Sequence, residues 1–195
     1  REQFAAKTED SHTYLLDSCP IILAKGRRSK HGKVARDLCS QCYNSARQEW
    51  YYGVKLHVFG NRRVGKLPIP CSMNVTTATL CDLWGAKQIM LDNQPIRDGV
   101  LYADKAYIDA DWSQTLQQNY NIQLLTPKKK RKDEVFISGD AYSSFVSGKR
   151  QPIESFFHWM NVVTGIQNAS HIRSSTGLLF HIFSSLALAL FHLNS

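Results

Sequence analysis

The alternation of apolar and polar positions predicts three strands in the first part of the chain. Residues 13–23 are rich in aliphatic and β-branched side chains, 50–59 alternate between apolar and polar types, and 67–76 form a third such segment. Segments of this kind, bounded by Gly, Pro and Asn, are typical of β-strands. Pro68 and Pro70 favour a start at the sheet edge for the third segment, because proline cannot donate a ladder hydrogen bond. We expect the three strands to form an antiparallel meander.

The second half of the chain alternates between helical spacing and short apolar runs. Apolar residues at helical spacing predict a helix over 79–91, and Asp109 is a suitable cap for a helix over 110–120. The runs at 99–103 and 122–125 are short enough to be buried strands. We expect these two strands to be parallel and separated by a helix.

Two helices are expected to end the chain. Pro152 is a favoured first residue of a helix, and apolar positions such as Ile153 and Phe157 repeat at helical spacing until Gly165. The last helix covers 177–193, and its apolar stretch is shorter than the about 20 residues that a membrane-spanning helix needs. We therefore expect a buried core or packing helix and no membrane partner.

The complete order is three strands, then helix, strand, helix, strand and two helices. Consecutive strands followed by alternating helices and strands are typical of a mixed sheet with helices on its faces. The predicted fold class is α/β: a ribonuclease H-like, mixed five-stranded sheet, with three antiparallel strands and then two parallel ones, flanked by helices. A chain of 195 residues suits a single domain over 1–195, with a basic loop inserted at 24–48.

The cysteines and the start of the chain bear on where the protein works. An odd count of five cysteines without a preceding signal peptide favours reduced thiols inside a cell. Cys39 and Cys42 have the spacing of half a zinc site, but no second close pair follows, so loop thiols are the favoured interpretation. The chain begins at Arg1 without an initiator Met, so we expect its N-terminal part to be missing.

Positive charge is concentrated in two segments. The net charge is +8, and residues 25–66 hold eleven Lys or Arg against two acids. Residues 128–132 add five consecutive positive charges, whereas 82–111 hold six acids against three bases. Basic segments around an acidic one suit a polyanion such as nucleic acid, because each neutralised phosphate releases counterions. The alternative from charge alone is a protein with solvated basic faces.

Three acids are candidates for a functional site. Asp17 lies in the middle of the first predicted strand, where an unpaired carboxylate is costly to bury. Asp104 follows the run at 99–103, and ligand sites form at the carboxyl ends of such strands. Glu154 lies in the first turn of the helix expected from Pro152. Each acid also has a structural alternative: a strand-end Asp paired with Lys or backbone, an Asp that starts a loop, and a Glu favoured by the helix dipole.

Three converging carboxylates would suit the cleavage of phosphodiester bonds. In-line displacement needs an activated water or 3′-hydroxyl and stabilisation of the leaving oxygen, and two divalent ions about 3.5–4 Å apart supply both. Mg²⁺ is a hard cation that a few carboxylates on rigid elements can hold. We expect Asp17, Asp104 and Glu154 to hold two Mg²⁺ or Mn²⁺ ions in this way.

The sequence resembles the transposases of bacterial insertion sequences that are named for an Asp-Asp-Glu (DDE) triad. The similarity extends over roughly residues 13–190. The matching segments, in order, are Leu15-Leu16-Asp17-Ser18 with Pro20-Ile21, Gly53-Val54-Lys55-Leu56-His57, Thr76-Thr77-Ala78 ahead of Asp82, Ala103-Asp104-Lys105-Ala106-Tyr107 and Arg150-Gln151-Pro152-Ile153-Glu154. Their common order, with 50 positions from Asp104 to Glu154, makes the resemblance specific.

The resemblance implies roles for the triad and for Arg150. Asp17, Asp104 and Glu154 match the catalytic and metal-binding acids of the family, and Arg150 would hold a phosphate near the scissile bond. Many relatives have a Tyr three positions before this Arg and a Lys seven positions after the Glu, where this chain has Ser147 and Asn161. Family members usually carry an N-terminal DNA-binding region, which we expect to be missing from this chain, and assembly on DNA as a homodimer is also expected.

The basic segments are the expected contacts to DNA, because phosphate contacts position DNA without reading its sequence. They comprise Lys128, Lys129, Lys130, Arg131 and Lys132 before the helix of Glu154, and Lys25, Arg27 and Arg28 after Asp17. A solvated charge run is the alternative for both segments.

The function that the resemblance implies is metal-dependent cleavage of DNA at transposon ends and strand transfer into target DNA. Its expected place is the bacterial cytoplasm, in association with the nucleoid. One alternative is an inactive transposase remnant that only binds DNA. Another is a nuclease of the ribonuclease H-like fold that cleaves the RNA strand of a hybrid.

Overall fold

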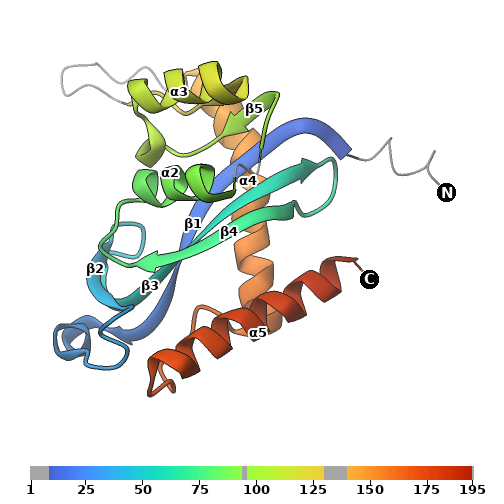
Figure 1. Ribbon diagram of the computed structural model, residues 1–195. Helices are drawn as coiled ribbons and strands as arrows, with labels where there is room; N and C mark the ends of the chain where they lie inside the picture. Colours follow the sequence, from blue (N-terminus) through green and yellow to red (C-terminus); the bar gives the residue numbers. More distant parts are fainter. Residues whose placement is uncertain (1–8, 94–95, 130–139, 195) are drawn as a thin grey trace. The chain divides into compact units, whose positions relative to one another are not determined.

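Residues 9–93, 96–129 and 140–194 are described by the computed structural model shown in Figure 1. Four strands come first along the chain, helices then alternate with two short strands, and two long helices follow. The elements of the first part are β1 (Glu9–Lys25), the 3-10 helix η1 (Gly26–His31), β2 (Ser40–Asn44), β3 (Glu49–Arg63) and β4 (Ile69–Thr77). The elements of the second part are α2 (Asp82–Asn93), β5 (Gly99–Tyr102), the 3-10 helix η2 (Lys105–Tyr107), α3 (Ala110–Tyr120), β6 (Ile122–Leu125), α4 (Ala141–Thr164) and α5 (Ser175–Asn194).

The described strands form one six-stranded mixed sheet with the order β2-β3-β1-β5-β6, and β4 pairs with β3. Strand β5 pairs in parallel with both β1 and β6, whereas β2 and β3 are antiparallel. The predicted α/β class with a mixed, partly parallel sheet is therefore confirmed. The predicted number of five strands is wrong, because β2 lies within the segment that we expected to be a loop.

The basic segment at 24–48 contains regular structure in place of a continuous loop. Helix η1 follows β1 directly, and β2 pairs with the start of β3, from Ser40 opposite Gly53 onwards. Gln41 in β2 donates a hydrogen bond of 2.9 Å to the hydroxyl of Ser29 in η1, which is buried. The short sequence of β2 has no apolar alternation, so this strand is specified by its backbone pairing with β3 and not by its own pattern.

Helix α4 begins at Ala141, so the prediction that Pro152 opens it is wrong. A proline inside a helix removes one hydrogen bond and crowds the carbonyl four residues earlier, which here belongs to Gly148. Around Gly148 no heavy atom lies within 4 Å of the position that a Cβ would take, so the crowded turn has room to adjust. Val146 and Ile153, on either side of the crowded turn, are fully buried. Their burial stabilises the helix through the proline, because tertiary packing supplies most helical stability.

The chain divides into two compact units, and several strands and α4 contribute to both. Unit 1 comprises Arg1–Asp17, Val58–Met73 and Asp82–Phe156, and unit 2 comprises Ser18–His57, Asn74–Cys81 and Phe157–Ser195. The core of unit 1 contains Leu16, Leu101 and Trp112, from β1, β5 and α3. A core cluster of unit 2 contains Ile22 and Tyr51. The expectation of a single domain over 1–195 stays a prediction.

Helix α5 belongs to unit 2 and buries only one of its faces. Leu178, Ile182 and Ala189 are buried, whereas Phe180 and Phe191 are 75% and 70% exposed. Of the two predicted alternatives, the structure therefore fits a helix that packs through one face and not a helix that is buried all round. By length and hydropathy, Ser175–Leu193 could cross a membrane, but core helices of globular proteins pass the same test. The predicted lack of a membrane partner stays a prediction.

Candidate active site

Strand β1 carries Asp17 on the sheet face opposite to the core of unit 1. Side chains alternate between the two faces of a strand, so Leu16 points to one face and Leu15 and Asp17 point to the other. Leu16 belongs to the buried core cluster, and Leu15 is fully buried as well. Both faces of the sheet are therefore covered at this point of β1, and the side chain of Asp17 is only 19% exposed.

The parallel pairing of β1 with β5 brings Asp104 level with Asp17. The last pair of the ladder is Leu15 opposite Tyr102. Asp17 lies two residues beyond Leu15 in β1, and Asp104 lies two residues beyond Tyr102, just after the end of β5. The backbone of Asp104 is still extended, with φ −78° and ψ 172°, so it continues the direction of β5. Because a step of two residues keeps the same face of a strand, both carboxylates belong to one face of the sheet.

Helix α4 crosses this face of the sheet. The rings of Tyr102 in β5 and Phe145 in α4 lie 6.3 Å apart, edge to face. In β3, a Cβ built on Gly60 would lie 3.6 Å from Cδ1 of Ile153, so the helix approaches this strand at a residue without a side chain. Strand β1 lies between β3 and β5. A helix that contacts both of these strands therefore passes over β1 and its Asp17.

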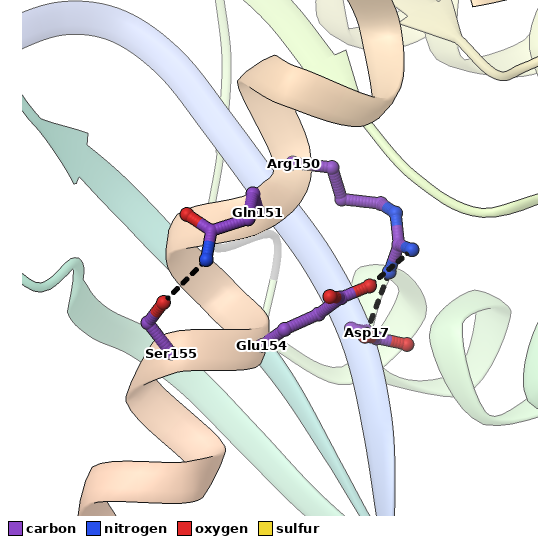
Figure 2. A network of polar contacts seen from close by, with 5 residues as sticks. All are labelled: Asp17, Arg150, Gln151, Glu154 and Ser155. Atoms are coloured by element: carbon purple, nitrogen blue, oxygen red, sulfur yellow. Dashed lines mark hydrogen bonds and ion pairs between the residues drawn. The ribbon is translucent and has the colours of Figure 1, made fainter. Parts of the chain in front are cut away.

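Arg150 of α4 joins two of the three predicted acids, as Figure 2 shows. Its Nη1 donates to Oδ2 of Asp17 at 2.9 Å, and its Nη2 donates to Oε1 of Glu154 at 2.5 Å. The side chain of Arg150 is 13% exposed, and that of Glu154 is 52% exposed. Gln151 and Ser155 form a separate hydrogen bond of 2.9 Å on the same helix (Figure 2). The guanidinium thus bonds both an acid of the sheet and an acid of the helix.

Glu154 is an interior residue of its helix and not a first-turn residue. Helix α4 begins at Ala141, about three turns before Glu154. The capping and dipole effects that favour Glu act within the first turn, so they do not apply here. A capping role in the first turn, the structural alternative for Glu154, is thereby excluded. Glu154 instead forms an ion pair with Arg150, which also forms an ion pair with Asp17.

The three acids fit the chemistry of a divalent cation. Carboxylate oxygens are the hard donors that Mg²⁺ prefers, and here they come from two adjacent strands and the helix that crosses them. Among the residues that the structure describes, no three His, Cys, Asp or Glu side chains lie close enough as they stand to hold a metal ion. The carboxylates of Asp17 and Glu154 are instead bonded to the guanidinium of Arg150.

Cys39 and Cys42 are free thiols at the start of β2. Burial, together with the negative charge of Asp37, raises the pKa of Cys39 to about 12. Among the described residues, no group of three or more His, Cys, Asp or Glu side chains could hold a metal ion at these two cysteines. The interpretation of these residues as structural thiols is therefore favoured over a zinc half-site.

Of the basic residues before α4, Lys128 has partners at the N-terminal end of that helix. Lys128 forms an ion pair with Asp140 at 3.3 Å, and its Nζ lies 5.7 Å from the ring centroid of Tyr142. Lys129 is exposed. The predicted contacts Lys130, Arg131 and Lys132 lie outside the described residues. Lys128 and Lys129 thus remain accessible cations at the N-terminal end of α4.

The basic residues after β1 line a cavity of about 690 Å³ in unit 2. Lys25, Arg27 and Arg28 contribute three cations to its lining, and Asn168 and Ser170 contribute polar side chains. Lys25 also forms an ion pair of 3.6 Å with Glu49, so part of its charge is already compensated. A concave surface with arginines and neutral hydrogen-bonding groups is suited to a phosphate group.

The sequence did not predict that Arg150 pairs with Asp17 and Glu154. Its expected role was to hold a DNA phosphate. A signal for the pairing was present in the spacing. Val146, Arg150 and Ile153 follow one another at helical intervals, and the two apolar residues are fully buried. A cation on the apolar face of a helix needs an anionic partner, because an unpaired buried charge is costly.

The two departures from the pattern of the relatives lie at different depths. Ser147 is exposed. The side chain of Asn161 accepts a hydrogen bond of 3.1 Å from the backbone N–H of Gln167, and its carbonyl accepts one of 2.8 Å from Gly165. Asn161 therefore stabilises the chain where α4 ends, a role that a Lys at this position would not fill in the same way.

Comparison with known proteins identifies a family. Residues 7–175 match the family described as transposase DDE domain. No curated protein matches the chain. Among solved structures, the chain is similar to the piggyBac transposase in a synaptic complex with hairpin DNA, with a TM-score of 0.54 and 10% sequence identity. The similarity covers 94% of this chain and 47% of the piggyBac chain, so this chain spans about half the length of that protein.

At 10% identity, the similarity to piggyBac shows a shared fold. The family match is more specific, since it covers well over half of the chain. The matched residues extend from before β1 to the start of α5, so they include all three predicted acids, Asp17, Asp104 and Glu154. The chain therefore belongs to the family of transposase DDE domains.

Proposed function

We propose that this domain cleaves DNA at the ends of a mobile element and joins the freed 3′-hydroxyl ends to target DNA. Its family supports an enzyme that acts on the phosphodiester bonds of DNA. The observation that carries the proposal is the arrangement of three acids on one sheet face. Asp17 and Asp104 are level on neighbouring strands, and Glu154 reaches the same place from α4 through Arg150.

Asp17, Asp104 and Glu154 are the proposed catalytic ligands of divalent metal ions. Transposase DDE domains are metal-dependent, and three carboxylates fit Mg²⁺ or Mn²⁺. A pair of such ions, when bound, activates the attacking oxygen and stabilises the leaving oxygen. The contribution of the chain itself is rigidity. Asp17 is part of β1, Glu154 is part of α4, and Asp104 directly follows β5 and the fully buried Ala103, so packed elements set the positions of the carboxylates.

Basic residues at two places are proposed to hold the DNA backbone. Lys25, Arg27 and Arg28 would bind a phosphate in the cavity of unit 2, where arginine can form paired hydrogen bonds with phosphate oxygens. Lys128 and Lys129 would contact the backbone near α4, and Lys130, Arg131 and Lys132 continue the same basic segment. These contacts would position the DNA and leave sequence recognition to other groups.

The proposed partners are the ends of the mobile element, the target DNA and a second copy of the protein. The piggyBac structure is a synaptic complex with hairpin DNA. We propose a comparable assembly of two copies on DNA for the protein that contains this domain. A bacterial insertion sequence is its proposed origin, and the cytoplasm, in association with the nucleoid, is its proposed place of action.

A nicking assay on supercoiled plasmid DNA tests the proposal. The wild-type protein is expected to nick DNA with Mg²⁺ or Mn²⁺ and not with EDTA. Asp104→Asn keeps the size of the side chain and removes its charge. It is expected to reduce nicking more than about 100-fold, because loss of even an outer-shell partner of a metal ligand costs about 10–100-fold.

Asp111→Asn is the matched control, because Asp111 is exposed in the first turn of α3. We expect this variant to nick DNA as the wild type does. Equal nicking by the wild type and Asp104→Asn would contradict the proposed site. Products joined to a second DNA, formed when 3′-hydroxyl ends are supplied, would distinguish a transposase from a simple nuclease.

A second candidate function is binding of DNA without cleavage. It is favoured by the ion pairs of Arg150, which occupy the carboxylates of Asp17 and Glu154, and by the departures at Ser147 and Asn161. Under this alternative, the wild-type protein binds DNA but produces no nick with any divalent cation. Cleavage confined to the RNA strand of an RNA–DNA hybrid would instead identify a ribonuclease on the same fold.

A further inference from the structure

We propose that Arg150 serves, in the metal-free protein, as the shared cation of Asp17 and Glu154, and that a divalent cation takes over this role in the active one. Binding of the cation then displaces the guanidinium and makes it available to a DNA phosphate. This inference rests on the proposed function, because it takes the two acids as metal ligands. It makes Arg150 a positioning residue in one state and a DNA contact in the other.

The contacts of Arg150 show that its charge serves two acids at once. Nη1 is bonded to Asp17 at 2.9 Å and Nη2 to Glu154 at 2.5 Å, so each of the two nitrogens serves one carboxylate (Figure 2). The guanidinium therefore bridges a strand and a helix, as a shared cation would. A bidentate pair with one carboxylate would be the stronger geometry for a purely structural arginine.

The arginine is also incompletely satisfied in this position. Its Nε is buried and has no hydrogen-bond partner within the described part of the chain. A buried donor without a partner costs free energy, so the present arrangement leaves one of the five donors of the side chain unused. A phosphate oxygen could accept from Nε and one Nη together, which is the common geometry of arginine with phosphate.

Electrostatics explains why something positive must stand between these acids. Asp17 is 19% exposed, and the two carboxylates that bond this one guanidinium would repel each other if it were absent. Arg150 supplies one positive charge against two negative charges. A divalent cation would balance the pair completely, and it would also accept Asp104 from the adjacent strand. The site is thus better matched in charge to the cation than to the arginine.

The guanidinium and a shared cation would compete for the same two carboxylates. Mg²⁺ holds its oxygen ligands at about 2.0–2.1 Å, so two carboxylate oxygens on one ion lie at most about 4 Å apart. The planar guanidinium keeps Oδ2 of Asp17 and Oε1 of Glu154 on different nitrogens, with a hydrogen bond on each side. A divalent cation bound to these two oxygens would repel the guanidinium that is hydrogen-bonded to them, because both groups are positively charged. The guanidinium and the cation therefore compete for the same pair of acids.

The test is the affinity of the protein for Mn²⁺, measured by electron paramagnetic resonance and by calorimetry without DNA. If the arginine competes with the cation, Arg150→Met removes the competitor. We expect this variant to bind Mn²⁺ about tenfold more tightly than the wild type. Arg150→Lys, which keeps the charge but bonds one acid at a time, is expected to fall between the two. An arginine that only orients the acids for the metal predicts the opposite, namely weaker binding by Arg150→Met.

Thermal unfolding in EDTA provides a second measurement on the same proteins. Arg150→Met is expected to melt several degrees below the wild type in EDTA, and Mn²⁺ is expected to raise its melting temperature more than it raises that of the wild type. Lys87→Met is the control, because Lys87 forms an ion pair of 3.4 Å with Asp109 away from the three acids. Its Mn²⁺ affinity should equal that of the wild type.

The outcomes separate this inference from the proposed function. Suppose that the wild-type protein binds Mn²⁺ and nicks DNA. Unchanged or weaker Mn²⁺ binding by Arg150→Met then overturns the role of Arg150 and leaves the proposed function standing. A wild-type protein that binds no Mn²⁺ at millimolar concentration overturns both. If Arg150→Met does not fold, the comparison of Arg150→Lys with the wild type carries the same decision.

Discussion

Nη1 of Arg150 lies 2.9 Å from Oδ2 of Asp17, although 133 positions separate the two residues. This contact connects the helix α4 to the middle of the strand β1. Through the second nitrogen of the guanidinium it also holds Glu154 beside the sheet. Two acids that would otherwise repel each other are thereby kept within reach of one cation. The predictions below test this site, its DNA contacts and the elements that position it.

Glu154→Gln is expected to abolish metal-dependent nicking and to preserve the fold. The substitution removes the charge of a proposed metal ligand, so the rate should fall more than about 100-fold. The measurement is nicking of supercoiled plasmid with Mg²⁺, together with a thermal melt of each protein. Gln151→Ala is the control on the same helix, because Gln151 is exposed and bonds Ser155. A Glu154→Gln protein with wild-type activity would remove Glu154 from the site.

Replacement of Arg27 and Arg28 by Ala is expected to weaken DNA binding in a salt-dependent manner. Both residues line the cavity of unit 2. Each lost phosphate contact lowers the slope of log K against log salt by about 0.9, so the double variant should lose about two units of slope. Fluorescence anisotropy with a DNA duplex at several salt concentrations measures this slope. Lys66→Ala, an exposed residue that does not line the cavity, is the charge control. An equal loss per charge in the control would mean that only net charge matters.

Asp109→Ala is expected to destabilise the protein at neutral pH and to have little effect in acid. Asp109 caps α3, because its side chain accepts a hydrogen bond of 2.6 Å from the backbone N–H of Trp112. This bond, together with Lys87, lowers the pKa of Asp109 below its ordinary value of 3.8 in spite of some desolvation. The loss of an N-cap of this kind costs about 1 kcal/mol of unfolding free energy.

The pH dependence of this effect has a definite sign. Because the pKa of Asp109 is lowered in the folded state, its stabilisation is present above pH 3.8 and is lost as the pH falls through the lowered pKa. Urea denaturation of the wild type and the variant across this range is the measurement. A difference in stability that grows as the pH falls would contradict the assignment.

Two glycines on site-bearing elements are expected to respond to alanine in opposite directions. A Cβ on Gly99, which begins β5, would lie 2.1 Å from the carbonyl oxygen of His12. Gly99→Ala is therefore expected to lower the unfolding free energy by about 1–3 kcal/mol. Gly148 lies inside α4 with nothing within 4 Å of its Cβ position, so Gly148→Ala should raise stability by about 0.5–1 kcal/mol. Urea denaturation tests both, and a destabilised Gly148→Ala would show that the turn before Pro152 has no room.

Local sequence signals were sufficient to predict several helices and strands. Asp109 was expected to cap a helix over 110–120, and α3 occupies that range with the predicted cap. The strand predicted at 122–125 is β6. In these segments the apolar period, the capping residue and the turn residues agree, and each acts within a few positions of the chain. When these local signals agree, a helix or strand can be predicted before its tertiary contacts are known.

Other elements depend on contacts that leave no local mark. The polar strand β2 exists because β3 offers it a backbone ladder. Helix α4 continues through Pro152 because Val146 and Ile153 are buried on both sides of its crowded turn. A proline normally marks a boundary, and this local preference is outweighed by packing that involves residues far away in the sequence.

The sequence by itself determined which donors are available for a site: an Asp in a strand, an Asp at a strand end and a Glu beside an apolar stripe. It also carried the order of motifs by which the DDE family is recognised. Only the tertiary structure decided that β1 and β5 pair in parallel, so that Asp17 and Asp104 follow paired positions, and that Arg150 bridges Asp17 and Glu154. The physical reason is that strand pairing joins Leu15 to Tyr102, 87 positions apart, and an ion pair joins Asp17 to Arg150, 133 positions apart. No local pattern encodes either contact.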